Sequence, residues 1–325
     1  MKVAFAGSFA AGLAEPVRAR LSPSCKVVVD NEDGIVPQLA DVDVLVSMAF
    51  SGRMAEAAPR LRLVQVPGAG LDRIERGALR PGTRLANAYG HEVGIAEYVI
   101  GAMIALTRSF GRLDAGLRQG RWESQWAVGS PAPPLWPELA GKTLGILGFG
   151  RIGQAVARRA AAFDMRVCAL RQQAQAETPA GVAFVGGPER LDDVLRQSDY
   201  LAVTLSLSPA TRGLLDVSRL RLMKSTAFLI NVARAEIIDE AALHRALASG
   251  RLAGAALDVW WSYPTSAEPT LPAARPFHEL GNVLMTPHVS GWTEGMLDAR
   301  AALIAGNIER TARGEPPLNL IDPAA

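Results

Sequence analysis

The chain has 325 residues, 49% of them hydrophobic, which is enough for two domains of ordinary size with sizeable cores. Lysine and arginine (34) nearly balance aspartate and glutamate (32), and no basic block stands out, so neither nucleic acid nor an anionic membrane is expected as a partner. No run of about 18 uncharged apolar residues occurs, so no membrane span is predicted.

The N-terminus and the cysteines favour a cytoplasmic protein. Met1 and Lys2 lead directly into an apolar strand that turn residues soon interrupt, a segment too short for a secretion signal. Cys25 and Cys168 lie far apart in strand-like segments, a pattern typical of buried thiols in a reducing compartment. No His/Cys/Asp cluster has ligand spacing, so no metal is expected.

The first part of the chain alternates short apolar runs with helical or loop segments, which predicts a parallel α/β sheet. The expected strands are residues 2–6, 26–29, 43–48, 63–66 and 84–88. Residues 7–12 contain two glycines but lack the three-glycine spacing of a nucleotide site, so we expect a turn there. A helix is expected near residues 94–107.

The next segment, residues 113–136, is rich in tryptophan and proline. Residues 130–137 form an irregular loop by composition, and Trp122, Trp126 and Trp136 are expected to anchor it. These exposed-looking side chains suit a contact between two copies of the chain.

The most informative stretch follows. An apolar strand, residues 144–147, runs into Gly148-x-Gly150-x-x-Gly153, and residues 154–163 continue with helical spacing. The first glycine permits a tight turn, the second lets the backbone approach a pyrophosphate, and the third lets the helix pack against the strand. Amides at the start of the helix then face the phosphates. The motif predicts a dinucleotide site that includes Arg151 and Ile152; the alternative is a purely structural turn.

The second strand of this region, residues 166–170, bears on which dinucleotide binds. NAD sites usually carry an acid at its tip, about 20 residues past the motif, to hold the ribose 2′-hydroxyl. Here the tip is Arg171-Gln172-Gln173, and no carboxylate occurs before Glu177. Because a guanidinium suits a 2′-phosphate, NADP(H) is predicted to be preferred, with NAD(H) possible. Alternatively, Arg171 stacks on adenine or points to solvent.

The remaining elements continue the alternation. Strands are expected at residues 200–204, 227–231, 255–259 and 282–285, and helices at 191–196 and 240–249. A last helix, residues 294–313, ends at Gly314-Glu-Pro-Pro.

Three segments stand at the ends of predicted strands of this sheet: Asn231-Val-Ala-Arg234, Gly254-Ala-Ala-Leu-Asp258 and Thr286-Pro-His288-Val-Ser-Gly291. Ligands of doubly wound sheets lie at the carboxyl ends of the strands, so the segments are expected to converge there. Together with the glycine motif they resemble the D-isomer-specific 2-hydroxyacid dehydrogenases, which include formate, phosphoglycerate and glyoxylate/hydroxypyruvate enzymes. The resemblance covers almost the whole chain.

The resemblance implies an α/β fold of two Rossmann-like domains with parallel sheets. The substrate domain would be discontinuous and flavodoxin-like, with residues 1–90 and 293–325. The dinucleotide-binding domain, residues 91–292, would be inserted in it. A homodimer through the cofactor domain is implied as well.

The resemblance also implies site residues. Arg234 would bind the carboxylate of a 2-oxo acid and polarise its carbonyl, and His288 would be the acid/base that protonates the alkoxide. The alternative for Arg234 is a structural ion pair with Glu236 or Asp239. Further cofactor contacts would come from Leu205, Ser206, Thr211, Val232, Ala233, Asp258, Ser290 and Gly291. Ala69 and Gly70 would contact the substrate.

One position departs from the family pattern. The glutamate that usually pairs with the histidine, or the glutamine of formate dehydrogenases, is replaced by Tyr263. We expect this phenol to orient His288 with a lower effective pKa than in a His–Glu enzyme, because it lacks the carboxylate charge. Glu268 is an alternative partner if its loop folds back.

The sequence therefore predicts an NAD(P)-dependent oxidoreductase that interconverts a 2-oxo acid and a D-2-hydroxy acid. Two other functions stay open. One is a formate- or phosphonate-type dehydrogenase, and the other is a non-catalytic dinucleotide-sensing protein of the same fold.

Overall fold

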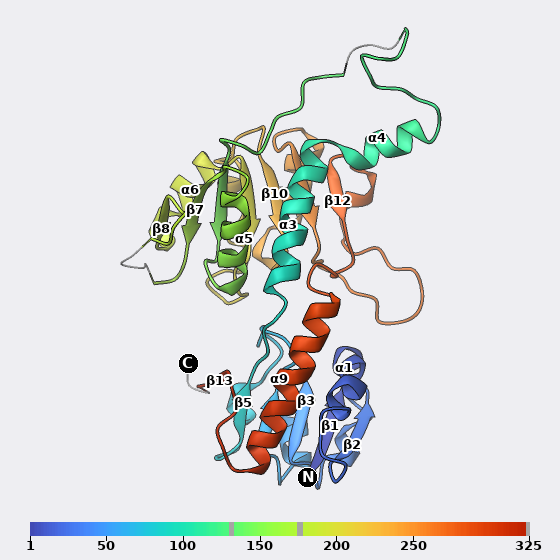
Figure 1. The fold of residues 1–325 in the computed structure, drawn as a ribbon, viewed down its shortest axis with the longest axis vertical. Coiled ribbons are helices and arrows are strands. Elements are labelled where there is room, and N and C mark those ends of the chain that lie inside the picture. The colour runs from blue at the N-terminus through green and yellow to red at the C-terminus, as the bar shows by residue number, and fades with distance from the viewer. Residues whose placement is uncertain (130–132, 174–177, 323–325) are drawn as a thin grey trace. The chain divides into compact units, whose positions relative to one another are not determined.

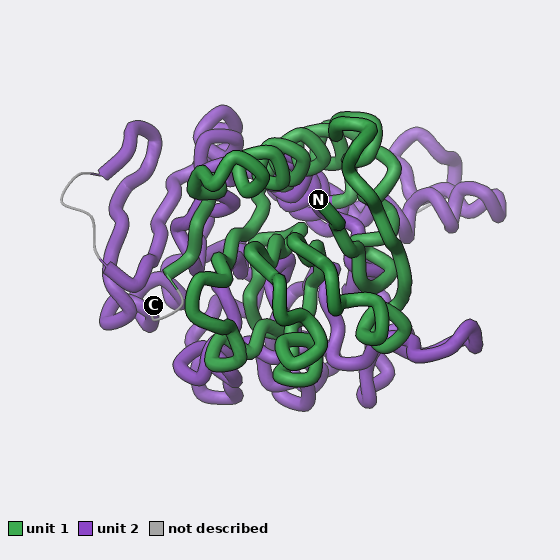
Figure 2. The backbone as a smooth tube through the Cα atoms, turned by 90° about the horizontal axis from the view of Figure 1, so that it is seen from below, with its two compact units in different colours: residues 1–91, 292–325 green, residues 92–291 purple. Residues whose placement is uncertain are grey.

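The computed structural model describes residues 1–129, 133–173 and 178–322. The chain forms two compact units, the first from Met1–His91 with Trp292–Ala325 and the second from Glu92–Gly291 (Figure 2). His91 and Trp292 thus belong to the first unit, one residue outside the expected boundaries at each crossing. Trp292 packs edge-on against Phe9, with ring centroids 5.6 Å apart, and His91 Nδ1 lies 2.7 Å from Arg300 Nη2, which holds both residues to that unit.

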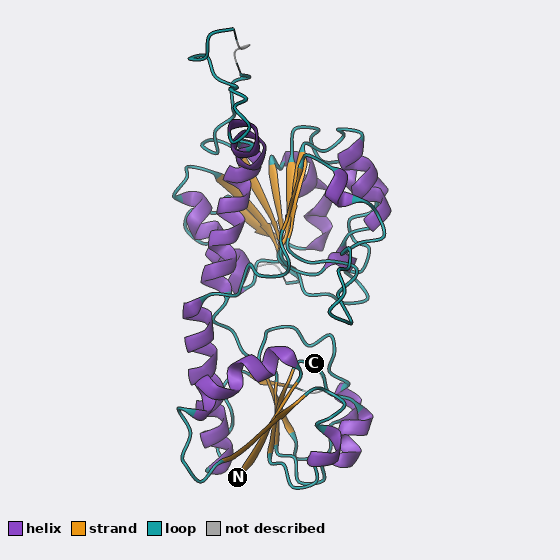
Figure 3. Cartoon of the chain, turned by 90° about the vertical axis from the view of Figure 1, so that its right-hand side faces the viewer, coloured by secondary structure: helices purple, strands orange, loops and turns teal. Residues whose placement is uncertain are grey.

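The first unit is built on a six-stranded sheet in the order β13-β5-β4-β3-β1-β2. Its strands are β1 (Lys2–Ala6), β2 (Lys26–Asp30), β3 (Val44–Ser47), β4 (Leu63–Gln65), β5 (Arg84–Ala86) and β13 (Leu320–Ile321). All pairings are parallel except that of β13 with β5. Helices lie on both sides of this sheet (Figure 3), which explains why its central strands are nearly continuous apolar runs.

The helices of the first unit are α1 (Ser8–Arg18), α2 (Gly52–Ala57) and α9 (Glu294–Ala312). The turn expected over residues 7–12 is wrong: Gly7 alone makes the turn, with φ +87°, and α1 starts at the next residue. Gly12 and Pro16 are unfavourable inside a helix, which is why none was expected here. The apolar side chains of Leu13 and Val17, one helical turn apart, are nevertheless fully buried.

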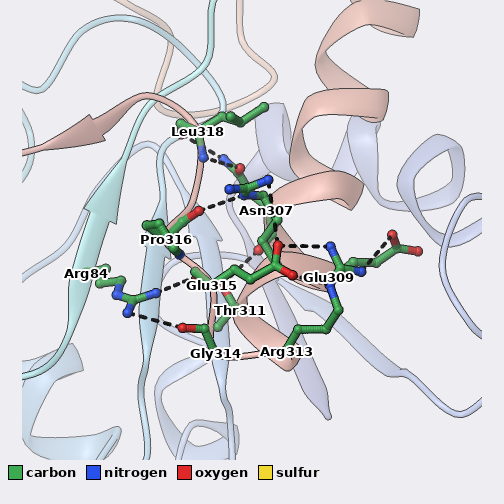
Figure 4. A network of polar contacts seen from close by, with 10 residues as sticks. Arg84, Asn307, Glu309, Thr311, Arg313, Gly314, Glu315, Pro316 and Leu318 are labelled. Carbon is green, nitrogen blue, oxygen red and sulfur yellow. Dashed lines mark hydrogen bonds and ion pairs between the residues drawn. The ribbon is translucent and has the colours of Figure 1, made fainter.

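The C-terminal tail is fastened to the first unit by polar contacts around the end of α9 (Figure 4). Arg84 donates to the carbonyl oxygens of Gly314 and Glu315. Asn307, fully buried, donates to Gln65 Oε1 at 2.7 Å and accepts the Leu318 amide at 2.7 Å. The tail can therefore return along β5 and add β13 antiparallel to it.

The second unit contains a seven-stranded parallel sheet in the order β12-β11-β10-β9-β6-β7-β8. Its strands are β6 (Thr143–Leu147), β7 (Arg166–Leu170), β8 (Phe184–Gly186), β9 (Tyr200–Val203), β10 (Phe228–Asn231), β11 (Gly254–Leu257) and β12 (Val283–Met285). The strand order reverses between β6 and β9, the position where doubly wound sheets bind ligands.

Helices cover both faces of this sheet (Figure 3). The helices of the second unit are α3 (Glu92–Thr107), α4 (Phe110–Leu117), α5 (Arg151–Ala161), α6 (Leu191–Gln197), α7 (Val217–Leu220) and α8 (Glu240–Ala248), of which α4 projects away from the sheet (Figure 1). Within the described residues no single helix is long and apolar enough to cross a membrane, although the bent pair α3 and α4 passes by length and composition.

The segment after α4 leads away from the rest of the second unit (Figure 1). The expectation that tryptophans anchor it to their own chain is wrong for Trp122 and Trp126, which are 58% and 86% exposed. Trp136 is half-buried. The expected loop at 130–137 is described only from residue 133 onward.

Candidate active site

The glycine turn joins β6 to α5. Gly148 has φ +105°, and a Cβ there would lie 2.8 Å from the Leu205 amide nitrogen, so only glycine fits the turn. A Cβ on Gly153 would lie 2.4 Å from the Gly148 carbonyl oxygen, which accounts for the close packing of α5. Gly150 differs, because a Cβ there would meet nothing within 4 Å. The tight turn at Gly148 and the close helix packing at Gly153 are as predicted. Gly150, the glycine expected to face a pyrophosphate, borders open space.

Arg171 follows β7, next to the strand that begins the glycine turn. Its amide donates to the Gly186 carbonyl oxygen at 3.0 Å, so the backbone at the tip of β7 is held by the end of β8. The side chain is half-buried, and Gln172 and Gln173 are exposed. Glu177, the first carboxylate of this loop, lies outside the described residues.

The loop after β9 lies against the glycine turn. Thr211 fixes it by donating to the Ser206 carbonyl oxygen at 2.8 Å and accepting the Ser208 amide at 2.8 Å. The structure therefore brings Leu205, Ser206 and Thr211 together in one closed loop beside Gly148.

Arg234 lies in the loop that follows β10. Asn231, fully buried, accepts the Ala233 amide at 3.1 Å and donates to the Arg234 carbonyl oxygen at 3.0 Å. The Arg234 guanidinium donates to the Ala233 carbonyl oxygen at 2.8 Å. Val232 and Ala233, which precede Arg234, are buried. Burial and these hydrogen bonds fix the backbone from which the Arg234 side chain extends.

Asp258 follows β11 and organises the loop after the neighbouring strand, β12. Its carboxylate is fully buried and accepts the Thr286 hydroxyl at 2.6 Å and the amides of Val289 and Ser290, each at 2.9 Å. The residues that donate these bonds precede and follow His288 in the sequence. His288 itself adopts the left-handed conformation, with φ +57°. A non-glycine residue in that region is unusual and needs support from its surroundings. Sequence reasoning missed this role of Asp258.

Two further residues support the same loop. Tyr98, on α3, has its hydroxyl 2.7 Å from Thr286 Oγ1, and the Trp260 indole donates to the Thr286 carbonyl oxygen at 2.8 Å. Because Thr286 gives its hydrogen to Asp258, the Tyr98 hydroxyl is the donor in its own contact. Burial raises the pKa of Tyr98 to about 12, so it stays a donor at any physiological pH. Neither supporting role has a signal in the sequence.

His288 pairs with Tyr263. Its Nδ1 lies 2.8 Å from the Tyr263 hydroxyl oxygen, which also accepts the Trp260 amide at 3.3 Å. Glu268, the alternative partner, is exposed in its loop. Arg234 is close enough for its charge to lower the pKa of Tyr263, although burial dominates and raises it. Arginine, tyrosine and histidine thus gather at the carboxyl ends of β10, β11 and β12.

Ala69 and Gly70 lie in the first unit, in the loop after β4. The Ala69 carbonyl oxygen accepts Asn87 Nδ2 at 3.1 Å, and the Gly68 carbonyl oxygen accepts the Ala88 amide at 3.1 Å. The loop is therefore fixed by the chain that follows β5.

The family model for the NAD-binding domain of D-isomer-specific 2-hydroxyacid dehydrogenases matches residues 100–290. The chain belongs to this family. It is an NAD(P)-dependent 2-hydroxyacid dehydrogenase, and the resemblance found in the sequence is confirmed.

Known relatives agree over nearly the full length. A glyoxylate reductase of Pyrococcus furiosus is 35% identical over 295 residues, which cover 89% of this chain and 84% of the relative. The solved 2-hydroxyacid dehydrogenase of Ketogulonicigenium vulgare Y25 is 30% identical, with a TM-score of 0.81 over 99% of this chain and 98% of that one. An NADPH-dependent glyoxylate/hydroxypyruvate reductase of Sinorhizobium meliloti, solved with NADP and sulfate, is 25% identical, with a TM-score of 0.79 over 100% and 98%. The two-domain Rossmann fold class is thereby confirmed.

Proposed function

We propose that this dehydrogenase reduces a small 2-oxo acid to the D-2-hydroxy acid, with Arg234 binding the substrate and His288 supplying the proton. The observation that carries the proposal is that a guanidinium and a hydrogen-bonded imidazole follow β10 and β12, the two neighbours of β11, and that both act on Tyr263 in the loop after β11. The names of the relatives, glyoxylate and glyoxylate/hydroxypyruvate reductases, point to short 2-oxo acids.

The second unit fits a pyridine dinucleotide. The space over Gly150 is open where a side chain would stand, and this glycine is the N-cap of α5, so the start of the helix suits a pyrophosphate. Among the described residues, Asp258 Oδ2 accepts one hydrogen bond, from the Ser290 amide, and a carboxylate oxygen can accept a second, here from a carboxamide. When bound, the reduced cofactor supplies the hydride. The proposed contacts are Gly148, Gly150, Arg151, Ile152, Gly153, Arg171, Leu205, Ser206, Thr211, Val232, Ala233, Asp258, Ser290 and Gly291.

A preference for NADP(H) is part of the proposal, with NAD(H) as a poorer cofactor. Arg171 supplies a positive charge at the tip of β7, where an acid would repel a 2′-phosphate. A comparison of kcat/KM for NADPH and NADH tests this, and a strong NADH preference would remove it.

The chain's own groups account for the chemistry. The forked Arg234 guanidinium can hold the substrate carboxylate and polarise the carbonyl oxygen as negative charge develops there. The ring of His288, fixed at Nδ1 by Tyr263, presents Nε2 to the oxygen that must be protonated. Ala69 and Gly70, in the first unit, remain predicted substrate contacts.

A panel of glyoxylate, hydroxypyruvate, phenylpyruvate and branched-chain 2-oxo acids, assayed with both reduced cofactors, tests the proposed function. We expect turnover of at least one acid and a D-configured product. Oxidation of formate or a phosphonate, with no turnover of a 2-oxo acid, would favour a formate- or phosphonate-type dehydrogenase. Tight dinucleotide binding with no turnover of any acid would favour a sensor.

We also propose that the protein is a homodimer through residues 113–136. The argument is the exposure of Leu117, Trp122, Trp126, Val128 and Leu135 on the segment that leaves the second unit. A second copy is the occupant that the family resemblance implies. The cytoplasmic location stays a prediction from the sequence.

A further inference from the structure

The Tyr263 hydroxyl is placed to give a hydrogen as well as to receive one. A phenol has one hydrogen and two acceptor positions. The Trp260 amide, 3.3 Å away, takes one acceptor position, and Nδ1 of His288 stands 2.8 Å from the same oxygen. The O–H can therefore point at Nδ1.

This freedom distinguishes a phenol from a carboxylate partner. An ionised carboxylate only accepts, so it keeps a hydrogen on Nδ1 and leaves Nε2 of the neutral ring bare. Such a ring donates from Nε2 only as imidazolium. A hydroxyl that donates to Nδ1 puts the hydrogen of the neutral ring on Nε2, the atom that faces the reacting oxygen.

We propose that Tyr263 is the ultimate proton donor of the reduction and that neutral His288 relays its proton to the substrate. The proposal rests on the proposed function. Hydride addition forms a C–H bond at the carbonyl carbon and leaves the electron pair on oxygen. An O–H bond forms there as the Nε2–H bond breaks, and an Nδ1–H bond forms as the Tyr263 O–H bond breaks. The starting state returns when Nδ1–H gives its proton back to the phenolate and Nε2 takes a proton from water, leaving hydroxide. Water reaches both groups because Tyr263 is 50% exposed and His288 is exposed.

The surroundings suit this role. Burial raises the pKa of the Tyr263 phenol, and the charges of Asp258 and Glu236 act in the same direction. The Trp260 amide and the charge of Arg234 oppose them and stabilise the phenolate that the relay leaves behind. These groups come from the loops after β10 and β11. The phenol thus stays protonated well above neutrality, at pH values above the usual titration range of an imidazole side chain.

The pH profile of kcat/KM for 2-oxo acid reduction tests the relay. The wild-type profile should stay level through the titration of an ordinary imidazole and fall only when the phenol ionises. The Tyr263→Phe protein should lose activity tenfold per pH unit above the imidazole titration, about a hundredfold two units above it. Tyr263→Glu restores a carboxylate, so it should show the same falling limb, displaced to higher pH by the added charge. Unfolding temperatures confirm that each variant is folded.

A second readout does not depend on turnover. The chain has four histidines, so ¹⁵N NMR of histidine-labelled protein can follow each ring, and the His288→Gln variant identifies the signal. We expect the Nε2–H tautomer at neutral pH in the wild type and Nδ1–H in the Tyr263→Glu protein. An Nδ1–H wild-type ring, or an unchanged pH profile in Tyr263→Phe, would overturn the relay alone. A wild-type protein that reduces no 2-oxo acid would overturn the proposed function instead.

Discussion

His288 owes its position to the buried carboxylate of Asp258, which directly follows the neighbouring strand β11. Asp258 accepts hydrogen bonds on both sides of the left-handed residue, so the imidazole is held by backbone as well as by Tyr263. A fully buried charge with three donors is costly to disturb, because any lost partner leaves an unsatisfied group.

Asp258→Asn places an amide hydrogen against one of these donors. We expect the free energy of unfolding to fall by about 1–3 kcal/mol and kcat to fall with it, since the His288 loop loosens. Thermal unfolding and steady-state kinetics measure both. Asp216→Asn is the matched control, because Asp216 caps α7 and asparagine caps equally well. Wild-type stability and kcat in Asp258→Asn would refute this role.

In the turn between β6 and α5, one glycine of the motif is needed for packing and another for the proposed cofactor binding. Gly153 is required by packing, whereas Gly150 faces open space. Its backbone, at φ −86°, accommodates an alanine.

Gly150→Ala should therefore leave the unfolding temperature unchanged and weaken NADPH binding, because the methyl group stands where the pyrophosphate is proposed. Gly153→Ala should destabilise the second unit by about 1–3 kcal/mol through overpacking against Gly148 and Ile146. Unfolding curves and fluorescence titration with NADPH distinguish the two effects. Unaltered NADPH affinity in Gly150→Ala would move the proposed phosphate site elsewhere.

The elements that carry the site were predictable because their sequence signals are local. The positions of β6, β7, β10, β11 and β12 agree within two residues with the ranges expected from apolar runs, and the turn after β6 agrees with the glycine spacing. The helix α1 was not predicted, because Gly12 and Pro16 interrupt the helical spacing of its apolar residues. The supports of His288 were missed for another reason. Tyr98, Thr286 and Asp258 meet only through tertiary packing, which no spacing along the chain reveals.

At the scale of the whole molecule, the exposed apolar segment after α4 stands out. Trp122 and Trp126, which were expected to anchor this segment, are 58% and 86% exposed in the single chain. Exposed apolar patches of this kind mark contact sites in soluble proteins.

We expect the wild type to sediment as a dimer at micromolar concentration and the double variant Trp122→Ser, Trp126→Ser to sediment as a monomer, because the variant removes apolar area from the contact. Leu271→Ser is the control, since Leu271 is 58% exposed in another loop of the same unit. A monomeric wild type would contradict the homodimer.

The central claim is that Arg234 and His288 perform the reduction, and kcat measured beside cofactor affinity tests it most directly. For the best 2-oxo acid of the panel, His288→Gln should lower kcat about 10²–10⁴-fold, and Arg234→Lys should lower kcat/KM about 10²–10³-fold. Both variants should bind NADPH as the wild type does. Wild-type turnover in either variant, or a loss explained entirely by weaker NADPH binding, would contradict the account.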